Sequence, residues 1–213
     1  MSGKQLCTSL LLLLAMAASA AAQDEKNEIG ATFGRIFISD QGIQNAAYAE
    51  SIIRSGKGFT IEGNYAHRFV INPLFSLAGE VLFAYNPDVD LNAGNFLNPV
   101  VPTNYSQLFV TPAARLNLFP ETAVSPWVSL GGGFAHFSED KNLDFGGATN
   151  PGKNTTSGTL EAGAGLDVKL WRKMSLRGEV RDFWSGEPDF PLAPTGKTRQ
   201  HNYLVGGGVI WRF

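Results

Sequence analysis

Residues 201–213 read HNYLVGGGVIWRF, and this stretch at the C-terminus decides the fold class. Successive side chains of a β-strand point to opposite sides, so a strand between two different environments alternates in polarity. One side of this stretch presents Tyr203, Val205, Gly207, Val209, Trp211 and Phe213. The other side presents Asn202, Leu204, Gly206, Gly208, Ile210 and Arg212. This period of two predicts a β-strand that ends in an aromatic residue at the last position.

Seven further segments repeat this alternation. They are residues 29–39, 58–68, 75–85, 105–118, 127–138, 158–170 and 175–185. In segment 158–170, for example, leucine and alanine occupy one side while Glu161 and Asp167 occupy the other. Segment 29–39 is largely apolar on both sides, so its register stays open. Together with residues 201–213, the pattern predicts eight strands of about 10–13 residues, the length that a tilted strand needs to cross a bilayer.

The connections between these strands alternate in length. Short connections lie near residues 70–74, 119–125 and 171–174. Long, polar connections cover residues 40–57, 86–104, 139–157 and 186–200, and they hold most of the turn-forming residues. In an up-and-down sheet, this order places all short turns at one end and all long loops at the other. That asymmetry is typical of outer-membrane barrels, which have short periplasmic turns and long outer loops.

The composition of the 213-residue chain narrows the possible classes of protein. The net charge is −2 and 17% of residues are charged, so no basic surface is present to neutralise nucleic-acid phosphates. With 44% hydrophobic residues, the chain is not expected to be intrinsically disordered. We find neither the residue spacing of a metal site nor a phosphate-binding loop, and we expect no cofactor.

The first 22 residues have the design of a secretory signal peptide. Lys4 supplies the positive start, residues 10–18 are apolar, and a run of alanines precedes the expected cleavage between Ala22 and Gln23. An N-terminal membrane anchor is the alternative, but the apolar run is shorter than the roughly 20 residues of a spanning helix. We therefore expect residues 1–22 to be removed, together with the only cysteine, Cys7, leaving residues 23–213 as one β-barrel domain.

Alternation alone does not say which side of a barrel faces outward. A soluble barrel would bury its apolar side, whereas a membrane barrel turns that side toward lipid. The polar sides hold mostly small residues and few charges, which suits the narrow interior of an eight-stranded barrel. Aromatic residues gather near the strand ends, as in the girdles at the two membrane boundaries. They are Tyr65, Tyr85, Phe119, Trp127, Trp171, Trp184, Tyr203, Trp211 and Phe213. The membrane arrangement is therefore favoured.

Charged residues on the polar sides are expected to meet inside the barrel. They are Glu62, Glu80, Arg115, Glu161, Arg177, Glu179 and Arg181. Buried charges are costly unless they are paired, so these groups should form ion pairs that plug the interior. A gated path for ions or small solutes through rearranging pairs is the alternative.

The chain resembles the small eight-stranded outer-membrane barrels of the OmpA, OmpX and opacity-protein type. The C-terminal strand ending at Phe213 and the stretch LRGEVRDFW at residues 176–184 are the basis of the resemblance. It implies an all-β, eight-stranded antiparallel up-and-down transmembrane β-barrel in the bacterial outer membrane, in contact with lipid and lipopolysaccharide. It also implies a signal for the outer-membrane assembly machinery, formed here by Tyr203, Val209, Trp211 and Phe213.

Specific function is expected in the four long loops, because lipid constrains most of the scaffold. One hypothesis is a structural or adhesin-like surface-interaction role. The alternative is a lipid-modifying enzyme or a narrow channel. Analogy with the family favours the first hypothesis, and the sequence does not indicate the ligand of the loops or the oligomeric state.

One pair of residues points toward an enzyme. His136 and Ser138 lie two positions apart and therefore share a strand face. The pair resembles the His-x-Ser pair of outer-membrane lipid A deacylases, but it lies on the fifth strand and Glu139, the next acidic residue, lies on the opposite face. A histidine at the membrane boundary beside a serine that starts a loop is the simpler interpretation.

Overall fold

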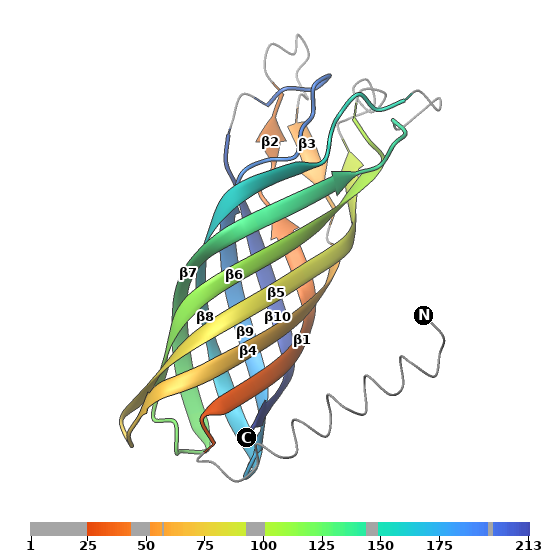
Figure 1. The fold of residues 1–213 in the computed structure, drawn as a ribbon. Helices are drawn as coiled ribbons and strands as arrows, with labels where there is room; N and C mark the ends of the chain where they lie inside the picture. The colour runs from red at the N-terminus through yellow and green to blue at the C-terminus, as the bar shows by residue number, and fades with distance from the viewer. Residues whose placement is uncertain (1–24, 44–51, 57, 93–100, 144–148, 196–197) are drawn as a thin grey trace, which may run out of the picture.

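The computed structural model describes residues 25–43, 52–56, 58–92, 101–143, 149–195 and 198–213 (Figure 1). The expected signal peptide and its cleavage site at Ala22 and Gln23 lie outside these residues. The strands are β1 (Asn27–Ile38), β2 (Gln41–Gly42), β3 (Ile52–Ser55), β4 (Phe59–Ile71), β5 (Phe75–Asn92), β6 (Asn104–Leu118), β7 (Val124–Glu139), β8 (Thr155–Trp171), β9 (Met174–Ser185) and β10 (Gln200–Arg212). No helix in this part of the chain is long and apolar enough to cross a membrane.

Eight of these strands close into an antiparallel barrel, which confirms the predicted fold class. Each barrel strand pairs with the next one along the chain, and β10 returns to pair with β1, for example at Ile29 opposite Trp211. β5 pairs with both β4 and β6, so the ring has no free edge. Closure satisfies the backbone hydrogen bonds inside the protein, as the interior of a bilayer demands.

The two ends of the barrel differ, as predicted from the alternating connections (Figure 1). The turns β4–β5, β6–β7 and β8–β9 lie at one end, together with the C-terminus; we call this the short-turn end. In the first of these turns, the Asn72 side chain accepts hydrogen bonds from the amides of Leu74 and Phe75. Such side-chain hydrogen bonds stabilise a turn of only a few residues. The opposite end bears the long connections and is called the loop end.

The sheet extends further into the loop end than the alternation predicted. β5 continues to Asn92, and the short strand β3, from within the first predicted loop, pairs with that extension. A register shift between Asn86 and Val89 explains the difference. Before the shift, even-numbered residues of β5 face inward, and after it odd-numbered residues such as Val89 and Leu91 are the buried ones. The bulge therefore interrupts the period of two on which the prediction relied.

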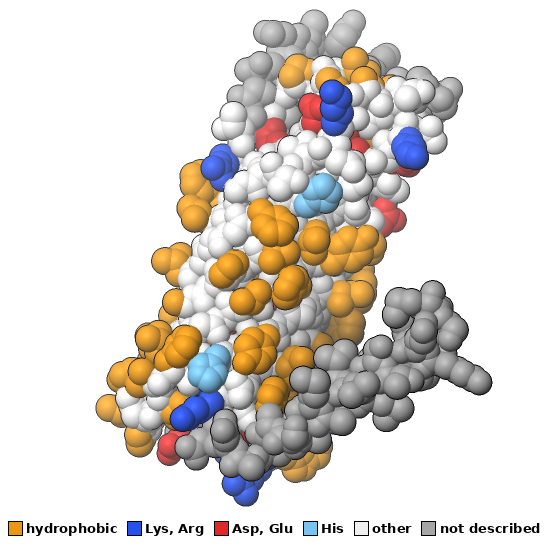
Figure 2. Space-filling view, viewed as in Figure 1, with side chains coloured by type: hydrophobic (Ala, Val, Ile, Leu, Met, Phe, Trp, Pro, Cys, Tyr) orange, Lys and Arg blue, Asp and Glu red, His pale blue; other side chains and the backbone are white. Residues whose placement is uncertain are grey.

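The barrel has inverted polarity. Large apolar side chains cover its outside, among them Phe33 (54% exposed) and Leu130 (70% exposed), whereas Arg115 and Arg181 inside are 0% exposed. Figure 2 shows hydrophobic side chains spread over the middle of the barrel, with charged side chains concentrated toward its two ends. This distribution fits a barrel whose outer face meets lipid, as the sequence analysis expected.

One aromatic residue does not belong to the predicted girdles. Trp127 points into the barrel and is 2% exposed, whereas the outward aromatics such as Trp171 and Trp211 are 65% and 48% exposed. Trp127 lies opposite Gly165 of β8, where a Cβ would come within 2.6 Å of the indole Cζ2 atom. The missing side chain of Gly165 therefore provides the space that lets an indole fit inside a narrow barrel. The position of Trp127 near a strand end predicted an outward side chain at the membrane boundary, and this prediction is wrong.

Candidate functional site

A network of ion pairs fills the interior of the barrel toward its short-turn end. Arg181 on β9 lies at its centre, with carboxylate oxygens of Glu161 at 2.8 Å, Glu80 at 2.9 Å and Glu179 at 3.0 Å. Glu62 is more distant, at 3.5 Å from the Arg181 Nε atom, and both of its carboxylate oxygens lack a hydrogen-bond partner. One guanidinium thus collects acidic side chains from β4, β5, β8 and β9.

Two further arginines extend this network toward the short-turn end. Arg115 on β6 pairs with Glu80 and, at 2.5 Å, with Glu28. Arg177 on β9 contacts Glu28 at 3.0 Å and binds Asp167 through two nitrogens, at 2.8 and 2.9 Å. Charge-assisted, two-point contacts of this kind fix orientation as well as charge. Every charged residue predicted for the interior lies within ion-pair distance of another one.

The network includes three residues that the prediction missed: Glu28, Asp167 and Arg212. Arg212 bonds Asp167 at 3.0 Å and Glu28 at 3.3 Å. Asp167 and Arg212 lie on the polar sides of their predicted strands but are not among the charged residues predicted to pair inside the barrel. Glu28 lies one residue before the first predicted strand. Extending that strand by one residue at the same parity as Thr32 would have indicated Glu28, which is buried.

Trp127 covers the arginines of this network. Its ring centroid lies 4.8 Å from the Cζ atom of Arg177, 4.9 Å from that of Arg181 and 5.8 Å from that of Arg115. The negative face of an indole attracts guanidinium groups, most strongly where water is excluded. Trp127 therefore contributes a favourable contact to all three arginines of the network.

An apolar layer closes the barrel nearer the loop end. Phe109 and Phe183 stack with centroids 4.5 Å apart, and Phe137 meets Phe109 edge-on at 6.3 Å. Leu82 and Leu204 are buried in the same cluster. The alternation of the sequence predicts an interior of small polar and charged residues, and this prediction is wrong for the part of the barrel near the loop end. Inward residues there are above the charges and can pack against one another as in an ordinary core.

The connections at the loop end pack into a compact outer head with its own buried residues. Val101, Leu143 and Ala193 come from three different connections and are 7% exposed or less. Pro102 pairs with Leu143 as an isolated bridge. A buried hydrogen bond of 2.7 Å joins Gln41 to Gln200, which links the first connection to the start of the last strand. The described loop residues thus form one surface and not separate arms.

Glu139 connects two parts of the outer head at the end of β7. Its carboxylate accepts a hydrogen bond of 2.9 Å from the Asn150 side chain, and Asp189 lies close enough to repel it. Burial, reinforced by the charge of Asp189, raises the pKa of Glu139 to about 7. The charge of this contact therefore changes near neutral pH.

The candidate catalytic pair does not assemble. His136 and Ser138 both lie on the outward face of β7, where the His136 Nδ1 atom bonds the Thr156 hydroxyl at 2.8 Å. The Ser138 hydroxyl donates to the Asn154 side chain at 3.3 Å. In the described part of the chain, neither side chain hydrogen-bonds to the other or to a carboxylate. Ser138 therefore lacks the general base that a nucleophilic serine needs.

The residues expected to guide assembly lie on the outside of the last strand. Tyr203, Val209 and Trp211 are between 41% and 48% exposed. Phe213 follows β10, and its backbone exchanges two hydrogen bonds of 2.9 Å with Asn27. The outward side chains are thus available to a partner, while the backbone of the C-terminal residue seals the junction between β10 and β1.

Comparisons with known proteins agree with this geometry. The family model described as outer membrane protein beta-barrel domain matches residues 8–213. Among solved structures, the Neisserial surface protein A is 14% identical, with 88% of this chain and 97% of that chain covered and a TM-score of 0.56.

Two further solved structures share the fold. The outer membrane protein OprG from Pseudomonas aeruginosa is 12% identical, with 88% and 96% of the two chains covered and a TM-score of 0.57. AlkL, an outer membrane protein solved in lipid bilayers, is 15% identical, with 90% and 92% covered and a TM-score of 0.51. A search of curated protein sequences gave no significant match.

Proposed function

Since the chain belongs to the family of outer membrane proteins with a β-barrel domain, and so resides in the bacterial outer membrane, we propose that it is a non-conducting barrel whose outer head makes contacts at the cell surface. The observation that best supports this role is the filled interior beneath the packed, described residues of the outer head. A barrel built for transport would need a continuous path, and a barrel built for display needs a rigid base.

The interior supports a closed barrel because two unlike layers lie in series. The ion-pair network around Arg181 occupies the part nearer the short-turn end, and the Phe109–Phe183 stack occupies the part nearer the loop end. An ion must separate paired charges in the first layer and cross apolar side chains in the second. Both steps are unfavourable, because the first leaves buried charges without partners and the second strips water from the ion. The narrow-channel alternative would need both layers to open together.

The outer head supports a surface-interaction role because its described residues pack together and leave a pocket between them. A pocket of about 530 Å³ lies between the start of β8 and the β9–β10 connection. Pro188, Pro191 and Pro194 line it, together with the acidic Glu187 and Asp189. Prolines restrict the backbone, so a partner that binds here would order few additional residues. By the same proposal, lipid and lipopolysaccharide surround the barrel, and the outer-membrane assembly machinery recognises its last strand.

His136 and Ser138 take no catalytic part in this proposal, since each is hydrogen-bonded to a neutral side chain of β8 or its preceding connection. We therefore expect no acyl loss from lipid A in cells that express the protein. The same lipid analysis on Ser138→Ala cells provides the comparison, and a difference between the two would restore the enzymatic alternative.

Two experiments test the proposal. In planar bilayers, the folded protein should give no steady conductance of porin size, and Phe183→Ala should also stay closed because the charged layer lies beneath it. A steady conductance of the unmodified protein would overturn the closed interior. Folding of each sample is checked by heat-modifiable gel mobility.

The surface role is tested on whole cells. Residues 186–199 are replaced by a glycine–serine linker of equal length, and residues 120–123 at the short-turn end are replaced in the same way as the matched control. The first replacement should reduce cell–cell aggregation and adhesion to immobilised matrix proteins, and the control should not. Equal adhesion of both variants and the unmodified protein would contradict the role of the outer head.

A further inference from the structure

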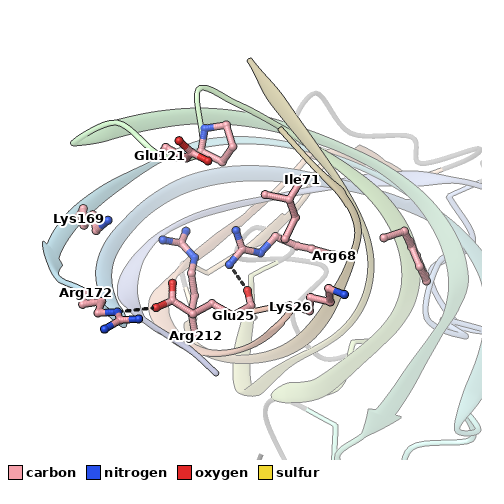
Figure 3. Close-up of a pocket in the computed structure, with 10 residues that line it drawn as sticks. Glu25, Lys26, Arg68, Ile71, Glu121, Lys169, Arg172 and Arg212 are labelled. Atoms are coloured by element: carbon pink, nitrogen blue, oxygen red, sulfur yellow. Dashed lines mark hydrogen bonds and ion pairs between the residues drawn. The ribbon is translucent and has the colours of Figure 1, made fainter. Parts of the chain in front are cut away.

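A cavity of about 820 Å³ opens at the short-turn end of the barrel, which faces the periplasm in this family (Figure 3). Its cationic lining residues come from five places in the chain: Lys26, Arg68, Lys169, Arg172 and Arg212. Glu25 and Glu121 are the acidic residues that line it. Figure 3 shows these side chains distributed around the mouth, with Arg68 and Arg212 close to its centre. The lining therefore has a clear excess of positive charge.

Two of these cations are paired with carboxylates. Arg172 pairs with Glu25 at 3.3 Å in an exposed contact, and Arg212 is engaged with Glu28 and Asp167 of the interior network. Arg68 differs, because no carboxylate of the described residues lies within ion-pair distance of it. Its Nη2 atom donates to the backbone carbonyl of Glu25, and its buried Nε atom has no hydrogen-bond partner.

Arg68 is nevertheless buried, with 7% of its surface exposed. A buried guanidinium without a counter-charge is costly, and native proteins normally pair such groups. Its guanidinium also has a donor geometry suited to a phosphate or carboxylate group. The combination of burial, a free donor and neighbouring cations is what an anion site requires.

The backbone holds Arg68 in this position. Its amide donates a hydrogen bond of 2.8 Å to the Lys26 carbonyl, which ties β4 to the residue before β1. A register shift in β4 directly follows, leaving Phe69 as the extra residue between Arg68 and Val70. Bulges of this kind commonly re-aim side chains near binding sites. Phe69 is 68% exposed at the rim of the cavity, so the mouth borders the apolar outer surface of the barrel.

We propose that this cavity binds an oxyanion of the phosphate class from the periplasmic side, with Arg68 as the buried donor. Lys169 and Lys26 add positive charge around it, and no carboxylate of the described residues forms an ion pair with Arg68, although Glu28 and Glu25 are near enough to attract it. The anion is either free phosphate or the headgroup of an anionic phospholipid in the inner leaflet. Both sources present the same oxygen atoms to the guanidinium, and the exposed Phe69 lies where an acyl chain would pass.

The test measures binding of inorganic phosphate to the purified, folded protein in a neutral detergent by titration calorimetry. The lipid arm measures retained phosphatidylglycerol by native mass spectrometry, with phosphatidylcholine as the uncharged comparison. Arg68→Gln should weaken binding about tenfold or more, since it removes a charge-assisted contact. Lys141→Gln at the loop end is the matched control and should bind like the unmodified protein.

A second variant guards against misfolding of Arg68→Gln. Lys169→Gln and Arg172→Gln together change only exposed side chains, and they should weaken binding and steepen its loss with salt while gel mobility stays normal. Phosphate binding that depends on these residues identifies a free ion, and retention of phosphatidylglycerol alone identifies a lipid headgroup. If neither probe binds, or if the charge variants bind as tightly as the control, the proposal is overturned. Conductance and adhesion are not involved, so this result is separate from the proposed surface role.

Discussion

The guanidinium of Arg177 lies over the indole ring of Trp127 inside the barrel, with the Arg177 Cζ atom 4.8 Å from the ring centroid. Arg181 approaches the same ring at 4.9 Å. The indole therefore joins the acidic group around Arg181 to the one around Arg177, which contains Glu28 and Asp167. An aromatic residue expected at the membrane boundary turns out to organise the charged interior.

Replacement of Trp127 tests this organisation. Trp127→Ala should lower the free energy of unfolding by about 3–5 kcal/mol, because it leaves a cavity and removes the ring that faces the arginines. Trp127→Phe keeps an aromatic face and should lose clearly less. Urea unfolding of the protein in phospholipid vesicles, followed by gel mobility, measures both. Equal losses for the two variants would show that neither the volume nor the aromatic face that Phe retains contributes to stability.

Arg181 is expected to be the most sensitive charged residue. Arg181→Met leaves Glu80, Glu161 and Glu179 without their shared cation, and removal of one partner from a buried network typically costs about 3–5 kcal/mol. Arg199→Met removes an exposed arginine that lies over Trp184, and this control should change stability by about 0.5 kcal/mol or less. The same urea assay applies. A loss below about 1 kcal/mol for Arg181→Met would mean that water reaches the network.

Packing of the outer head should depend on pH through Glu139. Its pKa in the folded protein, about 7, is above the ordinary value of 4.5, so the folded state favours the protonated form. The associated stabilisation is fully present below about pH 4.5 and is lost as the pH rises through about 7. We expect burial of the charge and repulsion from Asp189 to loosen the packing around Glu139 over this range, while the hydrogen bond from Asn150, which favours the charged carboxylate, opposes the change.

A dye attached to Lys153→Cys reports this change by its fluorescence anisotropy. Anisotropy should fall with a midpoint near pH 7 in the otherwise unmodified protein, whose expected mature form has no other cysteine. Glu139→Gln should remove the transition, whereas Asp140→Asn should retain it. A transition that persists in Glu139→Gln would assign the titration to another group.

Replacement of Phe213 distinguishes a role in outer-membrane assembly from a role in the stability of the folded barrel. Phe213→Ala retains the backbone hydrogen bonds to Asn27, so refolding in vitro should change the free energy of unfolding by only about 1 kcal/mol or less. If Phe213 forms part of the assembly signal, the amount of folded protein in isolated outer membranes should fall several-fold. Asn27→Ala, which keeps the same backbone bonds, is the control. Parallel losses in vitro and in cells would indicate a purely structural role.

Alternation along the chain was sufficient to determine the number of barrel strands and the end at which the long connections lie, and the small residues and sparse charges of the polar sides indicated which side faces lipid. These features depend on the period of two, which is a local property of neighbouring residues. Glu80, Arg115 and Arg181 were correctly expected on inward faces for this reason. The failures occur where local alternation breaks, as at the bulge after Asn86, or where an inward face was not expected to hold an indole.

Only the tertiary structure decided which inward residues meet. Parity assigns a side chain to the interior, but its height along the barrel depends on the register between strands that are distant in sequence. Glu28 and Arg177 are 149 positions apart and share a hydrogen bond, and Glu28 and Arg212 are 184 apart. Closure of β10 onto β1 creates these contacts. It also leaves Arg68 buried with no ion pair to a carboxylate of the described residues, because only groups that closure brings to the same height can pair with it.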